Sequence, residues 1–256
     1  MAKIISIHSF LRGVGKSNLV ANLAALLAAE GRRVGVVDTD LESPALHLLF
    51  GLGAEATPLS LNDYLRGECA IEQTVREVAP YLEMELKGRV FVVPASGDVA
   101  VIARGLGEGY NINLLQDGIL KLIEAFHLDA LLVDTHAGLS QATLAAAALS
   151  DVAAVVLHLD RQGYQGTGVW VEVARRLNAP RLTLIVNQVT AHFDLAEVKM
   201  RIEQTYRCQV TAVLPRADDM LALASAGLFV LRYPGHLLTT LLKQTAVGLT
   251  RWSHAH

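Results

Sequence analysis

The sequence of 256 residues has few cysteines, few aromatic side chains and no long hydrophobic run. Cys69 and Cys208 are its only cysteines, and their wide separation gives neither a C-x-x-C metal pair nor a disulfide framework. The longest nearly apolar run, 19–29, is interrupted by Asn22 and is too short to span a bilayer. We therefore expect two buried thiols, no metal cluster and a soluble protein.

The sequence also lacks a secretion signal and a strong charge of either sign. The first residues, MAKIISIHSF, contain no basic region followed by an apolar core and a small-residue cleavage site, so we expect a cytoplasmic protein. The net charge of −3 is uneven, because residues 1–150 carry 11 basic and 17 acidic side chains, whereas 151–256 carry 11 and 8. The basic excess of the second part would suit a polyanion, but a solvated surface is the simpler interpretation.

Apolar runs of strand length alternate with stretches of helical periodicity, a pattern typical of βαβ units. The predicted strands are 3–9, 33–39, 89–95, 129–135, 152–159, 181–188 and 209–215. The predicted helices are 16–30, 112–127, 140–149, 165–178, 194–206, 218–226 and 236–250. We expect one α/β domain over residues 1–256, a doubly wound and mostly parallel sheet with helices on both faces, and an insertion at its rim over 51–88.

The segment SFLRGVGKSN joins the first predicted strand to the first predicted helix. Gly15, Lys16 and Ser17 complete the end of the phosphate-binding pattern G-x-x-x-x-G-K-[ST], although Phe10 replaces its first glycine. Backbone N–H groups from Gly13 onward and the helix dipole would face phosphates, Lys16 would reach the β and γ oxygens, and Ser17 would offer a hydroxyl to Mg²⁺. The alternative is an ordinary strand-to-helix turn with an exposed lysine.

Three aspartates follow two of the other predicted strands. Asp38 and Asp40 end the second strand, and Asp134 ends the strand 129–135. Ligands of open α/β sheets bind at the carboxyl ends of the strands, so we expect these carboxylates to converge near the phosphate loop. Carboxylates beside phosphates require a cation, and Mg²⁺ is the natural choice. Helix caps or turns are the alternative for each aspartate taken singly.

The order of these segments, with the later IVNQV and VLPRADDM, resembles the MinD/ParA group of P-loop ATPases over nearly the whole chain. The usual loop of that group reads K-G-G-x-G-K-[ST], and its first lysine reaches the partner's phosphates in an ATP-sandwiched dimer. One branch has F-R-G-G-x-G-K-S followed by D-T-D-x-x-S-P-x-x-H, which fits Phe10 and the segment DTDLESPALH. Two positions depart from both patterns, because Leu11 replaces the cation and Arg12 replaces a glycine.

The resemblance implies a P-loop NTPase fold of the SIMIBI type, with roles for named residues. Asp40 would position the attacking water, Asp134 with Gly138 would form the Walker B and second switch, and Asn187 would hydrogen-bond the adenine. The expected nucleotide-contacting residues are Gly13, Val14, Gly15, Lys16, Ser17, Asn18, Asn187 and Pro215. Lys16, Asp40 and Arg12 are the expected catalytic residues, and Ser17, Asp38 and Asp134 the ligands of Mg²⁺, directly or through water.

The histidines carry no expected role. His136 stands where the family more often has proline, and we expect no active function for it. His8, His47 and His158 show no metal-ligand spacing with one another, so core or surface positions are expected.

Arg12 leaves two interpretations open. Its guanidinium could contact the partner's phosphates in place of the missing lysine, because a planar fork suits phosphate. Alternatively it points to solvent and strains the loop, if a glycine position with φ > 0 forces the same backbone on it.

Three functions are compatible with the sequence. The first is a slow, Mg²⁺-dependent ATPase that binds ATP or ADP and forms an ATP-dependent homodimer in the positioning or partitioning of a cargo. The second is an iron–sulfur reductase or metal carrier of the same superfamily, which needs cysteine pairs that this chain lacks. The third is a regulatory pseudo-ATPase that binds nucleotide without efficient turnover, because of Arg12.

The sequence indicates little about the binding partner of the protein. An unknown protein regulator or cargo is expected, and a cytoplasmic chain could still act peripherally on a membrane or on the nucleoid. The amphipathic stretch 236–252 could dock on a membrane, but a last core-packing helix is the simpler interpretation. Candidate DNA-docking residues are Arg175, Arg176, Arg181, Lys199 and Arg201.

Overall fold

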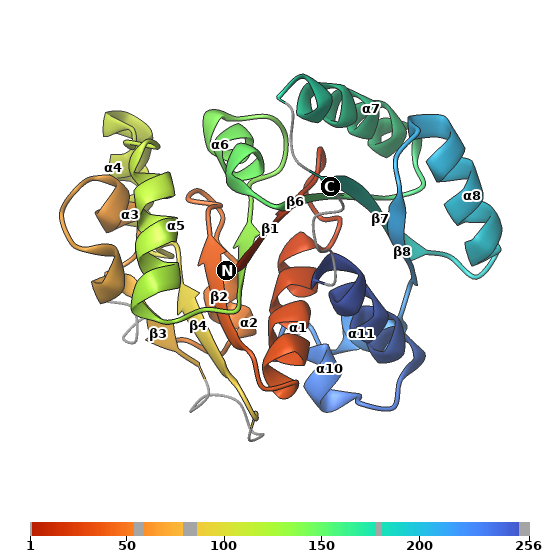
Figure 1. Ribbon diagram of the computed structural model, residues 1–256, viewed down its shortest axis with the longest axis horizontal. Helices are drawn as coiled ribbons and strands as arrows, with labels where there is room; N and C mark the ends of the chain where they lie inside the picture. Colours follow the sequence, from red (N-terminus) through yellow and green to blue (C-terminus); the bar gives the residue numbers. More distant parts are fainter. Residues whose placement is uncertain (1, 54–58, 79–85, 178–180, 251–256) are drawn as a thin grey trace.

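A single eight-stranded sheet forms the centre of the protein in the computed structural model, which describes residues 2–53, 59–78, 86–177 and 181–250 (Figure 1). The strands are β1 (Lys3–His8), β2 (Arg33–Asp38), β3 (Arg76–Glu77), β4 (Arg89–Val93), β5 (Ala130–Asp134), β6 (Val152–Leu157), β7 (Leu182–Val189) and β8 (Val210–Pro215). Their order is β3-β4-β2-β5-β1-β6-β7-β8. All neighbours pair in parallel except β3 and β4, so only the edge strand β3 runs antiparallel.

Helices cover both faces of the sheet. The helices of the described residues are α1 (Lys16–Ala29), α2 (Leu46–Leu49), α3 (Leu61–Leu65), η2 (Ile71–Thr74), α4 (Val99–Glu108), α5 (Leu114–Ala125), α6 (Gln141–Leu149), α7 (Arg161–Arg176), α8 (Leu195–Tyr206), α9 (Asp218–Ala222), α10 (Phe229–Arg232) and α11 (Leu237–Thr250). One layer contains α1, α2, α10 and α11, and the opposite layer contains α3, α5, α6, α7 and α8 (Figure 1). On β6, Val156 packs with the first layer and its neighbour Val155 with the second, as the alternation of side chains along a strand requires.

The predicted fold class is confirmed. All seven predicted strands are present within two residues of their expected ends, and their nearly continuous burial reflects cover on both faces. The described part of 51–88 contributes α3, η2 and the edge strand β3, which places it at the rim as expected, while 54–58 and 79–85 lie outside the described residues. The stretch 236–250 packs into the core as α11, and 251–252 lie outside the described residues.

Two helix predictions, for α7 and α9, were wrong in extent by more than two residues. α7 begins at Arg161 rather than at 165, because Asp160 caps it by accepting a hydrogen bond from the Gly163 N–H at 2.7 Å. α9 ends at Ala222 rather than at 226, because Ala224 and Ser225 have φ of 48° and 62°, outside the helical region.

The helix α4 was missed altogether. Its two glycines, Gly105 and Gly107, disfavour a helix, but Asp98 caps its start by accepting from the Ala100 N–H at 2.7 Å. Across the described segments, no helix combines the length and apolar character needed to traverse a bilayer.

Candidate functional site

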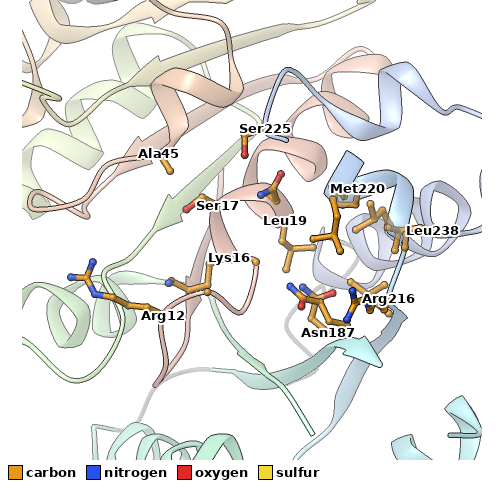
Figure 2. A pocket seen from close by; sticks show the side chains of 18 of the residues that line it. Arg12, Lys16, Ser17, Leu19, Ala45, Asn187, Arg216, Met220, Ser225 and Leu238 are labelled. Atoms are coloured by element: carbon orange, nitrogen blue, oxygen red, sulfur yellow. The ribbon is translucent and has the colours of Figure 1, made fainter. Parts of the chain in front are cut away.

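A pocket of about 470 Å³ opens at the carboxyl edge of the sheet, where the predicted site residues gather (Figure 2). Its walls come from the loop after β1, the loop after β2, the end of β7, the segment after β8, and α11. The predicted residues that line it are Arg12, Gly13, Gly15, Lys16, Ser17, Asn18, Asp40, Asn187 and Pro215. Val14, Asp38 and Asp134 are buried, and they are not part of the pocket wall.

The loop between β1 and α1 has the backbone of an anion cradle. Gly13 and Gly15 have φ of +78° and +86°, a region that glycine enters without steric cost. A Cβ on Gly15 would lie 2.7 Å from Asn187 Nδ2, so a side chain at this position would displace the Asn187 amide. α1 starts at Lys16 with no acidic residue in its first turn, and its N-terminal N–H groups are open to an anion. Lys16 itself is only 8% exposed.

Asp38 and Asp134 lie side by side behind this loop. They are aligned in the register of β2 and β5, and both are buried. Asp38 accepts hydrogen bonds from the N–H groups of Asp40, Ala45 and Leu46 at 3.1, 3.3 and 3.2 Å. Burial, and then the charge of Asp134, nevertheless raise the pKa of Asp38 well above its usual value.

Among the described residues, no backbone N–H group donates to the Asp134 carboxylate. Burial raises its pKa to about 6, although Ser17 and Lys16 face it and act in the opposite direction. Among the described residues neither of its oxygens has a hydrogen-bond partner of acceptable geometry. Two buried carboxylates next to a hydroxyl and an anion cradle fit Mg²⁺, which binds through one or two carboxylates while phosphates and waters complete its shell.

Asp40 occupies a different position from Asp38. It lines the pocket, and its Oδ1 accepts a hydrogen bond from the Ser43 N–H at 3.0 Å, which shapes the turn after β2. The three aspartates therefore converge as the sequence predicted, with two behind the phosphate loop and one facing the open pocket. Within the segments that the structure describes, no three His, Cys, Asp or Glu side chains are arranged to hold a metal ion by themselves.

A buried polar network lies beneath the loop, and no sequence pattern predicts it. His8 Nε2 is 2.7 Å from Ser6 Oγ, and its Nδ1 is 3.0 Å from Thr135 Oγ1, which donates to the Ile7 carbonyl at 2.9 Å. Since the Thr135 proton is committed to that carbonyl, His8 carries its own proton on Nδ1. Burial and the charge of Lys16 lower the pKa of His8 to about 3, so the ring is neutral and fixes Thr135 beside Asp134.

Phe10 has a packing role where the phosphate-loop pattern has glycine. A Cβ on Gly166 of α7 would come within 2.1 Å of the Phe10 ring, so the ring rests directly on the backbone of that helix. One turn further along α7, Trp170 stacks near His8 with ring centroids 4.2 Å apart. α7 is thus packed against the start of the phosphate loop at two points.

The opposite end of the pocket is apolar. Leu214, Met220, Leu238 and Leu242 contribute to its wall, and the two α11 leucines had no sequence signal because they lie far from any motif. Asn187 also lines the pocket (Figure 2). Its Nδ2 donates to the Val14 carbonyl at 2.8 Å and so also holds the phosphate loop.

The backbone around this apolar end is unusual. Gln188, Ala224 and Ser225, all of which line the pocket, have positive φ of 57°, 48° and 62°. Non-glycine residues enter this region at a steric cost, and such residues are concentrated at ligand sites.

Arg12 does not strain the loop, and that interpretation was wrong. Among the described residues, Arg12 is not one of those with positive φ. An arginine can therefore replace the glycine of related loops without backbone strain. Its side chain points away from Lys16 and Ser17 (Figure 2). There its Nη2 hydrogen-bonds His136 Nε2 and lies 3.7 Å from Glu42 Oε2. Leu11, in contrast, packs against the core.

Comparisons with known proteins agree with this geometry. The model of the CobQ/CobB/MinD/ParA nucleotide binding domain matches residues 5–230. An uncharacterized ATP-binding protein of Methanocaldococcus jannaschii is 29% identical over 235 residues, 91% of this chain and 82% of that protein. The flagellum site-determining protein YlxH of Helicobacter pylori is 29% identical over 187 residues, 73% of this chain and 58% of that protein. The structure of Pyrococcus horikoshii MinD complexed with Mg-ADP superposes with a TM-score of 0.81 at 21% identity, over 98% of this chain and 97% of that one.

Proposed function

This chain belongs to the family of CobQ/CobB/MinD/ParA nucleotide-binding domains, and from that premise we propose that it is a Mg²⁺-dependent slow ATPase. In this proposal ATP joins two copies of the chain, and hydrolysis releases them, so that the nucleotide sets when the protein engages its partner. The observation that carries the proposal is the unpartnered, buried carboxylate of Asp134 beside Ser17 and Lys16. We further assign the chain to the branch whose loop begins with phenylalanine, and treat residues 1–256 as one domain.

The site residues divide the work by position. Lys16 neutralises charge on the β and γ phosphates, while Ser17, Asp38 and Asp134 hold Mg²⁺, which when bound offsets the charge of the phosphates. Asp40, on the open side of the pocket, orients the attacking water. Asn187 and Pro215 bind the adenine. Gly13, Val14, Gly15 and Asn18 complete the cradle through their backbone and position.

A positioning role for a cargo or regulator protein is supported by the H. pylori relative, which is named as a flagellum site-determining protein. The structure gives less support for a DNA-binding surface. Arg176 and Arg201 pair with Glu172 and Glu197 of their own helices at 3.2 and 2.6 Å, which reduces the basic character expected for DNA docking. Arg175 donates to the carbonyls of Tyr206 and Arg207.

A membrane surface is supported even less, because most apolar residues of α11 face inward and Leu237 is its one strongly exposed leucine. Leu238, Leu242, Ala246 and Leu249 of this helix are all buried in the core. We therefore propose a cytoplasmic protein that engages another protein, with DNA or a membrane as a weaker possibility for peripheral attachment.

A regulatory pseudo-ATPase is the second candidate, and Leu11 is the observation that favours it. Because Leu11 packs against the core and carries no charge, the chain lacks the lysine that members of this group extend to a partner's phosphates. The reductase or carrier alternative loses support, because neither Cys69 nor Cys208 lines the pocket.

Light scattering and phosphate release, measured on the same samples with Mg²⁺ and ATP or ADP, test the proposal. We expect a monomer with ADP, a dimer with ATP and slow turnover. Asp40→Ala should bind ATP, remain dimeric and lose at least about 100-fold in turnover, because water positioning is removed without a phosphate contact. Asp117→Ala, on the exposed face of α5, is the control. Full turnover in Asp40→Ala would remove its assigned role, and binding without any turnover in the parent chain would favour the pseudo-ATPase.

A further inference from the structure

Three side chains from three different loops meet on the open side of the phosphate loop. Arg12 Nη2 hydrogen-bonds His136 Nε2 and lies 3.7 Å from Glu42 Oε2, and His136 Nε2 lies 3.8 Å from the same Glu42 oxygen. Arg12 belongs to the loop after β1, Glu42 to the loop after β2 and His136 to the loop after β5. These are the three loops that bring the phosphate cradle and the aspartates together.

The position of each partner in its loop makes the cluster relevant to the site. Glu42 follows Asp40 by two residues, and His136 follows Asp134 by two residues. A contact that fixes Glu42 and His136 therefore limits the movement of the two loops that carry the site carboxylates. Neither partner lies in the apolar end of the pocket, so the cluster acts on the phosphate end alone.

The chemistry of the three groups is complementary. Arginine only donates hydrogen bonds, so His136 Nε2 must be the acceptor and the His136 proton must be on Nδ1. A guanidinium carries five N–H donors in a rigid plane and can serve two partners at once, which a lysine ammonium does less well. Arg12 and Glu42 are 53% and 54% exposed, so their ion pair alone is weak, and the effect depends on joining three loops.

The contact also connects two separate departures from the sequence pattern. Arg12 stands in a glycine position and His136 in a position that more often has proline, and neither departure had an explanation from the sequence. In the structure the two side chains hydrogen-bond each other. Each substitution supplies the partner of the other.

We propose that Arg12, Glu42 and His136 form a cis bridge that holds the loops after β2 and β5 against the phosphate loop. Glu42 and His136 act as positioning residues, because through Arg12 they keep Asp40 and Asp134 in register with the phosphate cradle. The consequence for turnover rests on the proposed ATPase function, whereas the bridge itself exists without nucleotide. Arg12 thereby has a role within its own chain, independent of any contact to a partner's phosphates.

Hydrogen–deuterium exchange on the full nucleotide-free chain tests the bridge without reference to activity. Arg12→Ala should speed exchange roughly three- to tenfold in both segments 39–45 and 135–140, because local opening becomes easier in each loop. Glu42→Gln should act chiefly on 39–45. The double variant Arg12→Ala/Glu42→Gln should exchange no faster than Arg12→Ala alone, since the two residues share one interaction. Arg176→Ala, which breaks the exposed pair with Glu172, is the matched control and should leave both segments unchanged.

Two outcomes would overturn the bridge. Unchanged exchange in both loops of Arg12→Ala would show that the contact restrains nothing, whatever happens to activity. If Arg12→Ala loses ATP-dependent self-association while exchange in both loops stays normal, Arg12 acts on the second copy of the chain and not within its own.

A turnover measurement then separates this proposal from the ATPase function. With turnover in the parent chain, Glu42→Gln should lower kcat roughly threefold or more while the ATP affinity stays within about twofold, because Glu42 does not line the pocket. Equal kcat in Glu42→Gln and parent would contradict the positioning role. A parent chain without turnover would defeat the ATPase proposal, while the exchange result would still decide whether the bridge exists.

Discussion

The two ends of the pocket are built by opposite means. The phosphate end consists of polar groups at the ends of three adjacent central strands, β1, β2 and β5. There the buried His8, Asp38 and Thr135 have hydrogen-bond partners, whereas the Asp134 carboxylate has none among the described residues. The base end is assembled from β7, β8, the segment after α9, and α11, and its wall is mainly apolar. The first end is fixed by hydrogen bonds between neighbouring strands, whereas the second depends on packing between distant segments.

From this difference we expect the two ends of the pocket to contribute unequally to the free energy of ligand binding. At the phosphate end, charged and oriented groups act on a charged ligand, and the loss of one group is not compensated by its neighbours. At the base end, a flat aromatic ring meets several apolar side chains, so each residue contributes a smaller share. The phosphate end should therefore respond to single substitutions with large effects, and the base end with small ones.

The largest expected effect comes from the phosphate end. Lys16→Ala should weaken the binding of both MgATP and MgADP by about 100-fold or more, roughly 3 kcal/mol, because a charge-assisted contact in a largely buried site is lost. Isothermal titration calorimetry measures both affinities. Lys121→Ala, an exposed lysine on α5, should bind like the parent chain. An unchanged affinity in Lys16→Ala would move the nucleotide away from this loop and remove the contrast between the two ends.

The next effect tests the cost of the unpartnered carboxylate at the same end. The folded pKa of Asp134, about 6, lies above its ordinary value of 3.8 because burial favours the protonated form. The folded protein therefore binds this proton more tightly than the unfolded chain, and stability that is present below about pH 4 is lost as the pH rises through 6. Without Mg²⁺ or nucleotide, this loss is on the order of 2–3 kcal/mol between pH 4 and pH 7.

Urea unfolding of the parent and of Asp134→Asn across that range measures the loss directly. The variant should lack this part of the pH dependence and be the more stable protein at pH 7 without ligand. Saturating MgADP should reverse the order, because only the parent carboxylate binds the cation. Asp117→Asn, a surface change on α5, should follow the parent at every pH. Parallel curves for the parent and Asp134→Asn would mean that the carboxylate is not destabilised by its surroundings.

A third prediction concerns the packing that supports the phosphate end from outside the pocket. Gly166→Ala should destabilise the protein by about 1–3 kcal/mol, because the added methyl group would overlap the Phe10 side chain, at 2.1–2.6 Å from two ring carbons and the Cβ. Gly168→Ala is the matched control in the same helix, since its Cβ meets only Tyr206 at 3.8 Å. It should be neutral or slightly stabilising, because alanine favours a helix over glycine. Equal stabilities of the two variants, measured by thermal unfolding, would show that Phe10 is free to move from α7.

The same contrast explains what the sequence could predict. The loop after β1 and the three aspartates meet at one edge as predicted, because each lies at or just after the end of an apolar strand and parallel strands bring their carboxyl ends to one edge. The base end offered only Asn187 and Pro215, because Leu238 and Leu242 reach the pocket from a helix whose sequence pattern indicates core packing alone. Positive φ at Ala224 and Ser225 has no local signature, since neither residue type favours it.

Contacts between loops could not be predicted from the sequence either. The Arg12 to His136 contact joins residues 124 positions apart, and the His8 network depends on which side of β1 faces β5. Periodicity and spacing specify secondary structure and strand ends, but they do not specify which surface side chains meet across loops. The sequence therefore predicted that the loop and the aspartates meet at one edge of the sheet, but it did not predict the hydrogen bonds around them.

The smallest effect is expected at the base end, where Asn187 lines the pocket and also contacts the phosphate loop. Asn187→Ala should lower the preference for ATP over GTP by about fivefold, or roughly 1 kcal/mol, if its side chain hydrogen-bonds the adenine. The same side chain donates to the Val14 carbonyl, however, so its removal could loosen the phosphate loop instead. Tripolyphosphate separates the two effects, because it fills the phosphate end and has no base. Reduced selectivity with unchanged tripolyphosphate affinity would assign Asn187 to the base end. A parallel loss of ATP, GTP and tripolyphosphate affinity, with Asn113→Ala as an inert control on the exposed start of α5, would assign it to the phosphate end and leave base selection to the apolar wall.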